Sequence, residues 1–237
     1  MPFLANPIFC ALDTTDAGQA VAWARAVRPH VGGVKIGMEF FYANGRAGYE
    51  AVAAEGAPIF LDLKLHDIPN TVAGGLRALM TLDPAPALVT VHTTGGPGMM
   101  RAAKDAAAET TKVIGVTIMT SLDNRDIHAV GYSRDGTTAD HVLSMSELTR
   151  ASGLDGVVCS PLEIERVKQS TSSEFLTVVP GIRPASSDVG DQKRVASPGA
   201  AVKAGADVIV VGRAITKSAD PAASAKAISA EVEDARG

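Results

Sequence analysis

Several residue types are scarce in this chain, and their scarcity limits how it can fold. Of its 237 residues only two are cysteines, and aromatic residues make up 4%. Two cysteines cannot form a disulfide framework for a chain of this length, so the fold must depend on a packed core. Cys10 and Cys159 both lie within apolar runs, and we expect them to be buried thiols. With few aromatic rings, the core must consist mainly of Ala, Val, Leu and Ile.

The charge and hydropathy patterns exclude two further classes of protein. Acidic residues outnumber basic ones by 26 to 22, and no basic stripe of the kind that binds nucleic acid is visible. No apolar run approaches the roughly 20 residues that a membrane helix requires. Residues Met1–Pro7 carry neither a basic stretch nor a long apolar run, so we expect no secretory signal. We therefore expect a cytoplasmic protein that binds neither nucleic acid nor membrane.

Short apolar runs rich in β-branched residues alternate with Ala-rich helical patterns along the whole chain. Such alternation is typical of βαβ units and a parallel sheet. The predicted strands are Ile8–Asp13, Gly33–Met38, Ile59–Lys64, Leu88–His92, Val113–Met119, Gly156–Ser160, Leu176–Gly181 and Val208–Arg213. The predicted helices are Ala17–Val27, Phe40–Ala54, Thr71–Met80, Gly98–Ala108, Ala139–Ala151, Leu162–Gln169, Gly199–Gly205 and Pro221–Ala235.

Eight such units in this length predict an α/β fold of the (β/α)₈ barrel type. A doubly wound open sheet is the alternative, but it normally has fewer strands and a Gly-rich first turn. The first turn here, Leu12–Asp16, contains no glycine. No linker or low-complexity tract divides the chain, so we expect one domain spanning residues 1–237.

Polar residues gather where the predicted strands end, which is where barrels of this type build active sites. A single charged residue at a strand end is often there only because the chain first meets solvent at that point. If none of these residues had a function, however, we would expect the charged residues to be scattered over both ends of the strands. The polar and charged residues at or near these ends are Asp13, Lys35, Asp62, Lys64, His92, Thr120, Ser121, Arg183 and Arg213.

The third predicted strand is the most informative. Because side chains alternate between the faces of a strand, Leu61, Leu63 and Leu65 should face the helices. Asp62 and Lys64 should then share the other face and point into the barrel mouth. Removing two opposite charges from water there is costly unless they pair, and a purely structural ion pair is one interpretation.

Asp67 follows this strand and admits two interpretations. It stands just before Pro69 and a helical pattern, where Asp is a common N-cap. Together with Asp62 and Lys64, however, it completes the pattern D-x-K-x-x-D. The segment Asp62–Thr71 closely resembles the corresponding motif of orotidine 5′-monophosphate decarboxylases, although related sugar-phosphate enzymes share the short pattern.

Other segments resemble the bacterial form of this family in the same order, over nearly the whole chain. Val179 departs from it, where bacterial members often have Thr. The matching segments are Ala11–Asp13, Val34–Gly37, Val91–His92 with Gly95–Gly96, Thr120–Ser121, Gly156–Ser160, Pro180–Pro184, Gly190–Gln192 and Val211–Thr216.

The resemblance implies decarboxylation of orotidine 5′-monophosphate to uridine 5′-monophosphate without a metal or cofactor. Fixed charges in the site would then stabilise the ring carbanion. Lys64 is expected to donate the proton to that carbanion, and Asp62 to lie near the departing carboxylate. Lys35 and Asp67 would extend these two residues into an alternating array of charges.

The resemblance also implies how the substrate is held. Arg213 with the backbone near Gly212 would bind the phosphate, for which the planar guanidinium is well suited. Gln192, in a polar loop after the seventh strand, would be the lid residue. The remaining expected substrate contacts are Asp13 with the ribose, Thr120 and Ser121 with the pyrimidine, and Pro180 and Arg183 near the lid. Asp67 and Thr71 would reach the neighbouring subunit's site, so we expect a homodimer.

Two alternatives remain at this stage. A magnesium-dependent decarboxylase or aldolase of sugar phosphates would share Asp13, Asp62, Lys64 and Asp67, but would lack the Thr120–Ser121 pair and the lid glutamine. A barrel that only binds a nucleotide is the other alternative, and the presence of Lys64 argues against it.

Overall fold

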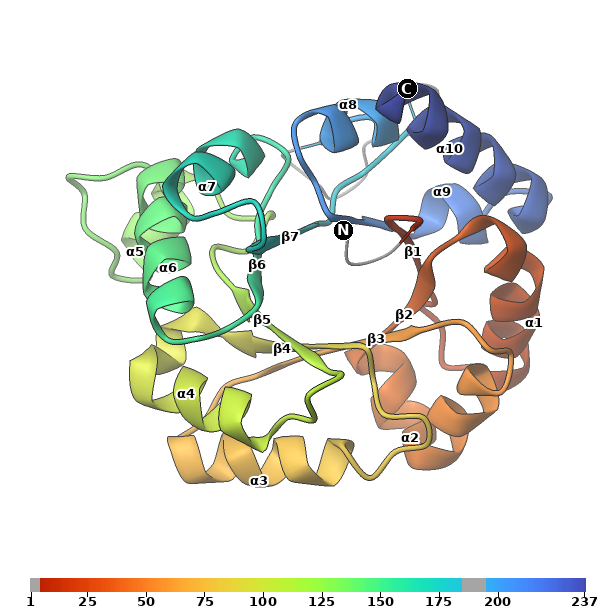
Figure 1. Cartoon of the computed structure of the whole chain (residues 1–237), viewed down its shortest axis with the longest axis horizontal. Coiled ribbons are helices and arrows are strands. Elements are labelled where there is room, and N and C mark those ends of the chain that lie inside the picture. Colours follow the sequence, from red (N-terminus) through yellow and green to blue (C-terminus); the bar gives the residue numbers. More distant parts are fainter. Residues whose placement is uncertain (1–4, 185–194) are drawn as a thin grey trace.

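The computed structural model, which describes residues 5–184 and 195–237, is a closed barrel of eight parallel strands. The strands follow one another around the barrel in sequence order, and β8 pairs with β1 (Figure 1). The predicted (β/α)₈ barrel is therefore confirmed. The strands are β1 Ile8–Ala11, β2 Gly33–Gly37, β3 Ile59–Leu65, β4 Leu88–His92, β5 Lys112–Val116, β6 Gly156–Val158, β7 Leu176–Val179 and β8 Val208–Val211.

The helices form a ring around the barrel (Figure 1). They are α1 Ala17–Val27, α2 Met38–Ala53, α3 Pro69–Leu79, α4 Gly96–Ala106, α5 Asn124–Ala129, α6 Thr138–Ala151, α7 Ile164–Ser170, α8 Pro198–Lys203, α9 Arg213–Thr216 and α10 Pro221–Arg236. Two short 3-10 helices, Arg28–His30 and Thr93–Gly95, accompany them. Helices α5 and α9 were not predicted. Helix α5 lies between the predicted strand Val113–Met119 and the predicted helix Ala139–Ala151.

Local side-chain chemistry explains where several helices begin. The Asp16 carboxylate accepts a hydrogen bond from the Gln19 N–H at the start of α1.

The N-cap interpretation of Asp67 is wrong. Pro69 is the first residue of α3, which makes Ile68 the N-cap and leaves Asp67 one residue outside the helix. Its carboxylate instead accepts from the Ile68 N–H at 2.6 Å.

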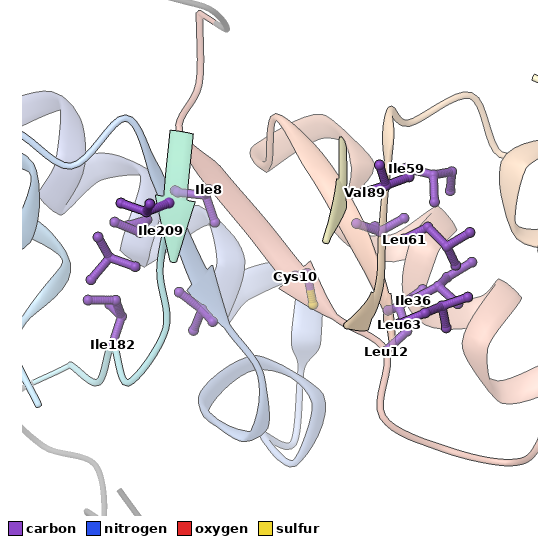
Figure 2. Close-up of a cluster of buried hydrophobic side chains, with 14 of the residues drawn as sticks. Ile8, Cys10, Leu12, Ile36, Ile59, Leu61, Leu63, Val89, Ile182 and Ile209 are labelled. Carbon is purple, nitrogen blue, oxygen red and sulfur yellow. The ribbon is translucent and has the colours of Figure 1, made fainter. Parts of the chain in front are cut away.

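Alternation along the strands separates two hydrophobic layers. The outer layer fills the space between barrel and helices, and Figure 2 shows part of it, with Ile59, Leu61 and Leu63 together on one side of β3. This confirms the predicted orientation of the apolar side chains of β3. The inner layer fills the barrel with Phe9, Ala11, Phe60, Leu88, Ile114, Leu176, Val178, Val208 and Val210. Cys10 and Cys159 are fully buried in the outer layer, as expected.

Most strands end one to three residues earlier than the sequence patterns suggested. Strand β1 stops at Ala11 and β8 at Val211, so Asp13 and Arg213 lie just beyond the hydrogen-bonded ladder. The polar residues after the strands are consequently gathered at the carboxyl ends of the strands, which we call the mouth of the barrel. Within the described ranges, no helix is long and apolar enough to cross a membrane.

Candidate active site

A cavity of about 660 Å³ opens at the mouth of the barrel. Its floor consists of inner-layer and neighbouring apolar side chains, among them Phe60, Val116, Val158, Val178 and Val210. Polar side chains surround this floor on several strand ends. An apolar floor with a few converging polar groups is the usual form of a small-molecule site. The polar residues that line it are Asp13, Lys35, Asp62, Lys64, Thr120, Ser121, Arg183, Arg213 and Lys217.

Four of these side chains form a row of alternating charge across three neighbouring strands. The Asp13 carboxylate lies 3.4 Å from the Lys35 ammonium, and that ammonium lies 3.6 Å from Asp62 Oδ2. The same oxygen accepts a hydrogen bond from Lys64 Nζ at 2.8 Å. Each charge is thus held by an opposite one, which offsets the cost of removing it from water.

Asp62 is the most enclosed member of this row, with 8% of its surface exposed. Burial alone would raise the pKa of its carboxyl group. The positive charges of Lys35 and Lys64, together with hydrogen bonds from Lys64 and Thr90, outweigh burial and hold the pKa below its ordinary value. Asp62 is therefore an anion at neutral pH, fixed beside the ammonium of Lys64.

Strand β3 is distorted where it carries these charges. Leu61 pairs with Val89 and Leu65 pairs with Val91, so the segment between them contains two more residues on β3 than on β4. Lys64 lies in this bulge with a φ of 51°, the only positive φ among non-glycine residues of the described chain. This left-handed conformation costs about 1–2 kcal/mol for a residue with a side chain. Bulges often redirect a side chain next to an active site, and this one directs Lys64 to the cavity.

Thr90, on β4, was missed by the sequence analysis. Its hydroxyl donates to Asp62 Oδ1 and accepts from the Lys64 backbone N–H, both at 2.9 Å. Alternation along β4 places Thr90 on the inner face, but neither its type nor its spacing indicates a function. Only the irregular register of β3 against β4 brings it between the two charged residues.

Because Gly37 has no side chain, there is room beside it for the Lys35 ammonium. Gly37 is the last residue of β2, and a Cβ atom at this position would lie 3.0 Å from Lys35 Nζ and 3.5 Å from Asp13 Oδ1. A side chain at this position would therefore press on the Asp13–Lys35 pair.

Positive charge gathers on the β7 and β8 side of the mouth. Arg183, Arg213 and Lys217 all line the cavity there. Burial, and secondarily the positive charge of Arg213, lowers the pKa of Arg183. An anion bound between the two guanidinium groups would offset this repulsion, and Arg binds phosphate oxygens in a bidentate manner. Lys217 was not predicted, although its position four residues after Arg213 could have suggested it.

Two histidines stand beside the row of charges. The rings of His66 and His92 lie 5.2 Å apart, and the Thr94 hydroxyl is 3.4 Å from His66 Nε2. Burial, followed by the positive charges of His66 and Lys64, lowers the pKa of His92. His92 is therefore neutral at pH 7. Neither ring lines the cavity.

The structure brings most of the predicted site residues together. Asp67 and Thr71 are exceptions, since both are exposed and neither lines the cavity of this chain. The predicted lid residue, Gln192, lies outside the described residues. Those that line the cavity are Asp13, Lys35, Asp62, Lys64, Thr120, Ser121, Pro180, Arg183, Gly212 and Arg213. Within residues 5–184 and 195–237, no group of three or more His, Cys, Asp or Glu side chains is placed to hold a metal ion.

Comparison with known proteins gives a consistent result. Residues 6–228 match the model of the orotidine 5′-phosphate decarboxylase / HUMPS family. The chain is 50% identical to orotidine 5′-phosphate decarboxylase of Erythrobacter litoralis over 227 residues, covering 96% of this chain and 99% of the relative. Its counterpart from Novosphingobium aromaticivorans is 49% identical with the same coverage. Among solved structures, orotidine 5′-phosphate decarboxylase of Lactobacillus acidophilus matches with a TM-score of 0.81 and 36% identity, covering 96% of this chain and 99% of that one.

Proposed function

This chain belongs to the orotidine 5′-phosphate decarboxylase / HUMPS family, and from that premise we propose that it converts orotidine 5′-monophosphate to uridine 5′-monophosphate in pyrimidine synthesis. The observation that carries the proposal is the Asp62–Lys64 pair. It lies at the edge of a closed apolar floor, in the same cavity as a group of cations suited to a phosphate. The cavity thus offers complementary groups for both ends of a nucleotide that carries a ring carboxylate.

Lys64 is proposed as the proton donor. When the bond between the pyrimidine ring and its carboxylate breaks, the electron pair stays on the ring carbon and CO₂ leaves. The Lys64 ammonium then gives a proton to that carbon, and the neutral amine regains one from solvent. No adjacent electron sink exists on the ring, so fixed charges that are already in place must stabilise the carbanion. The hydrogen bond that the ammonium donates to Asp62 holds it in place before the substrate arrives.

Asp62 is proposed to lie near the departing carboxylate. It is held as an anion by Lys35 and Lys64. A carboxylate of the substrate beside it would be repelled, and that repulsion would disappear as neutral CO₂ forms. Asp62 would also fix the Lys64 ammonium, so its two effects act on the same step.

The opposite side of the mouth is proposed to bind the phosphate. Arg213, with the backbone at Gly212, would hold the phosphate oxygens, with Arg183 and Pro180 near the same end. Asp13 would bind the ribose hydroxyls, and Thr120 and Ser121 the pyrimidine edge. Binding energy from the phosphate, far from the reacting carbon, can orient the ring against Lys64. Gln192 is proposed to close over the bound substrate.

We further propose that the chain acts in the cytoplasm as one domain, and as a homodimer. Asp67 and Thr71 lie outside the cavity of their own chain and are exposed, as a contribution to a neighbouring site requires. In that arrangement Asp67 of one subunit would extend the row of charges at Lys64 of the other.

The loss of orotidylate absorbance in excess EDTA tests the proposed reaction. Rapid loss, with uridylate as the product, is the expected result. If orotidylate persists while a ketose phosphate is consumed after magnesium is added, the chain is a sugar-phosphate enzyme. In that case the roles of Ser121 and Gln192 are wrong.

Mixing two inactive variants tests the shared site. Lys64→Ala and Asp67→Ala homodimers each lack one essential group per site, but a mixed dimer contains one intact site. Random mixing of equal amounts should restore about one quarter of the wild-type activity. An absence of rescue, after mass spectrometry has shown that mixed dimers form, would contradict the arrangement.

A further inference from the structure

We propose that Thr90 is a positioning residue for the reaction, whose single hydroxyl fixes the carboxylate of Asp62 and the backbone of Lys64 relative to each other. The inference rests on the proposed function, because it assigns a role to Thr90 through the two residues that would act on the substrate. Thr90 itself does not line the cavity.

The geometry assigns each side of the hydroxyl to one partner. Its proton is donated to Asp62 Oδ1, and its oxygen accepts the proton of the Lys64 N–H. With 1% of its surface exposed, Thr90 has no water in competition for these bonds. The β-branched side chain has few rotamers, so the hydroxyl is fixed by the backbone of β4.

The hydrogen bond from the Lys64 N–H to Thr90 stabilises the distorted part of β3. Lys64 lies in the bulge, where the regular register with β4 is interrupted. Its backbone N–H would lack a buried acceptor without Thr90, and an unpaired buried N–H is costly. The hydroxyl therefore stabilises the left-handed conformation that turns the Lys64 side chain toward the cavity.

The carboxylate of Asp62 is divided between two sets of donors. Oδ2 faces the ammonium groups of Lys64 and Lys35, whereas Oδ1 is bound by Thr90. Without Thr90 the carboxylate could rotate about its terminal bond and change its position against Lys64. A displacement of about 1 Å near reacting groups can reduce a rate by about 10²-fold.

Thr90→Val tests the inference, because valine keeps the shape and removes the hydroxyl. We expect kcat for orotidylate to fall by about 10²-fold, while the Kd for uridylate changes by less than about threefold, because the phosphate contacts are intact. Thr90→Ser keeps the hydroxyl and should retain kcat within about fivefold of wild type. The low-pH limb of kcat should move to higher pH in Thr90→Val only, since Thr90 donates to the charged form of Asp62.

Thr177→Val is the matched control. Thr177 is fully buried on β7, and its hydroxyl also donates to an aspartate, Asp207, at 3.0 Å. That pair lies at the opposite end of the barrel from the cavity. The control therefore loses a buried threonine–aspartate hydrogen bond of the same kind, and we expect its kcat and pH profile to match wild type.

Two results would overturn the role of Thr90. One is wild-type kcat in Thr90→Val, and the other is an equal loss in Thr90→Ser and Thr90→Val, which would assign the effect to shape. If Thr90→Val does not fold, Thr90→Ala and Thr90→Ser replace it, because these two differ only in the hydroxyl and the same criteria apply.

Hydrogen exchange at the Lys64 amide separates this inference from the proposed function. The exchange rate should rise at least about tenfold in Thr90→Val and remain near wild type in Thr90→Ser. If wild-type protein does not consume orotidylate, the proposed function is wrong, and the positioning role in that reaction is wrong with it. Unchanged exchange in Thr90→Val would instead overturn the hydrogen bonds of Thr90, whatever the activity of the wild type.

Discussion

Lysine–aspartate pairs lie at both ends of this barrel, and the comparison shows how the same residue types serve different purposes. At the amino ends of the strands, which we call the foot, Asp207 precedes β8 and binds Lys168 at 2.6 Å. The same carboxylate oxygen also accepts from the backbone N–H of Thr177 at 2.7 Å. The pair connects α7, β7 and β8 through one carboxylate.

The foot contains a second such pair in an equivalent position. Asp155 precedes β6 and binds Lys104 at 2.5 Å and the backbone N–H of Val113 at 2.8 Å. Lys112 approaches its other oxygen at 3.4 Å. In each case the aspartate joins the start of one strand to its neighbour, and none of these residues lines the cavity. Pairs of this kind connect neighbouring strands and lie away from the cavity.

At the mouth, by contrast, the charges are bound mainly to one another. Asp62 is held by Lys35, Lys64 and the Thr90 hydroxyl, and no described bond joins its carboxylate to a backbone N–H. Lys64 pairs with Asp62 yet lies in a strained backbone conformation and lines the cavity. The Lys64 ammonium is held by Asp62 and still lines the cavity, so it is available to a substrate. The lysines of the foot do not line the cavity.

Replacement of one lysine at each end should separate the two roles most sharply. Lys64→Ala should reduce kcat by about 10⁴-fold or more, since it removes both the proton donor and the charge that stabilises the carbanion. Lys168→Ala should leave kcat within about twofold and should lower the free energy of unfolding. Initial rates with orotidylate and denaturant titrations measure both quantities.

Binding of uridylate provides the control for Lys64→Ala, because the phosphate contacts remain and calorimetry should still detect the complex. Turnover that survives in Lys64→Ala would remove this residue from the mechanism. A loss of turnover in Lys168→Ala with unchanged stability would mean that the two ends are not independent.

Arg213→Ala tests whether the mouth also differs from the foot in binding an external anion. We expect kcat/KM for orotidylate to fall by about 10²-fold, because a charge-assisted contact with the phosphate is lost. The penalty should shrink for orotidine, which has no phosphate. Steady-state rates with both substrates give the comparison, and an equal penalty on both would contradict the phosphate assignment.

The sequence predicted the architecture and most of the cavity because both follow from local patterns. Alternating apolar runs and helical patterns indicated eight βα units, and alternation within β3 placed Asp62 and Lys64 inside, opposite Leu61 and Leu63. The active-site rule for barrels then directed attention to the residues after the strands, such as Arg213.

The parts that were missed depend on register between strands and on helix starts. The bulge at Lys64 arises from the pairing of β3 with β4, which no local pattern reveals, and the role of Thr90 follows from that bulge. Asp13 was expected to contact the ribose, and its pairing with Lys35 was not predicted. Asp67 was misread as a possible N-cap because the position of Pro69 moves the start of α3 by one residue.

Asp207→Ala tests the foot directly. The substitution leaves the Lys168 ammonium and the Thr177 N–H without their carboxylate, so the free energy of unfolding should fall by about 2 kcal/mol. The kcat for orotidylate should stay within about twofold of wild type at a temperature where the variant is folded. Urea titration and initial rates measure the two effects, and a large loss of kcat in folded protein would show that the foot influences the mouth.

Lys217→Gln should give the smallest effect and would show how far the anion site extends. Lys217 lines the cavity beside Arg213 but is exposed, so its charge is screened by solvent and salt. We expect KM for orotidylate to rise about threefold at low ionic strength with kcat unchanged, and the difference to vanish in about 0.5 M salt. Lys226→Gln, on the exposed side of α10, removes the same charge outside the cavity and should leave KM at the wild-type value. An equal rise in KM for both variants would attribute the effect to net charge and confine the anion site to the two arginines.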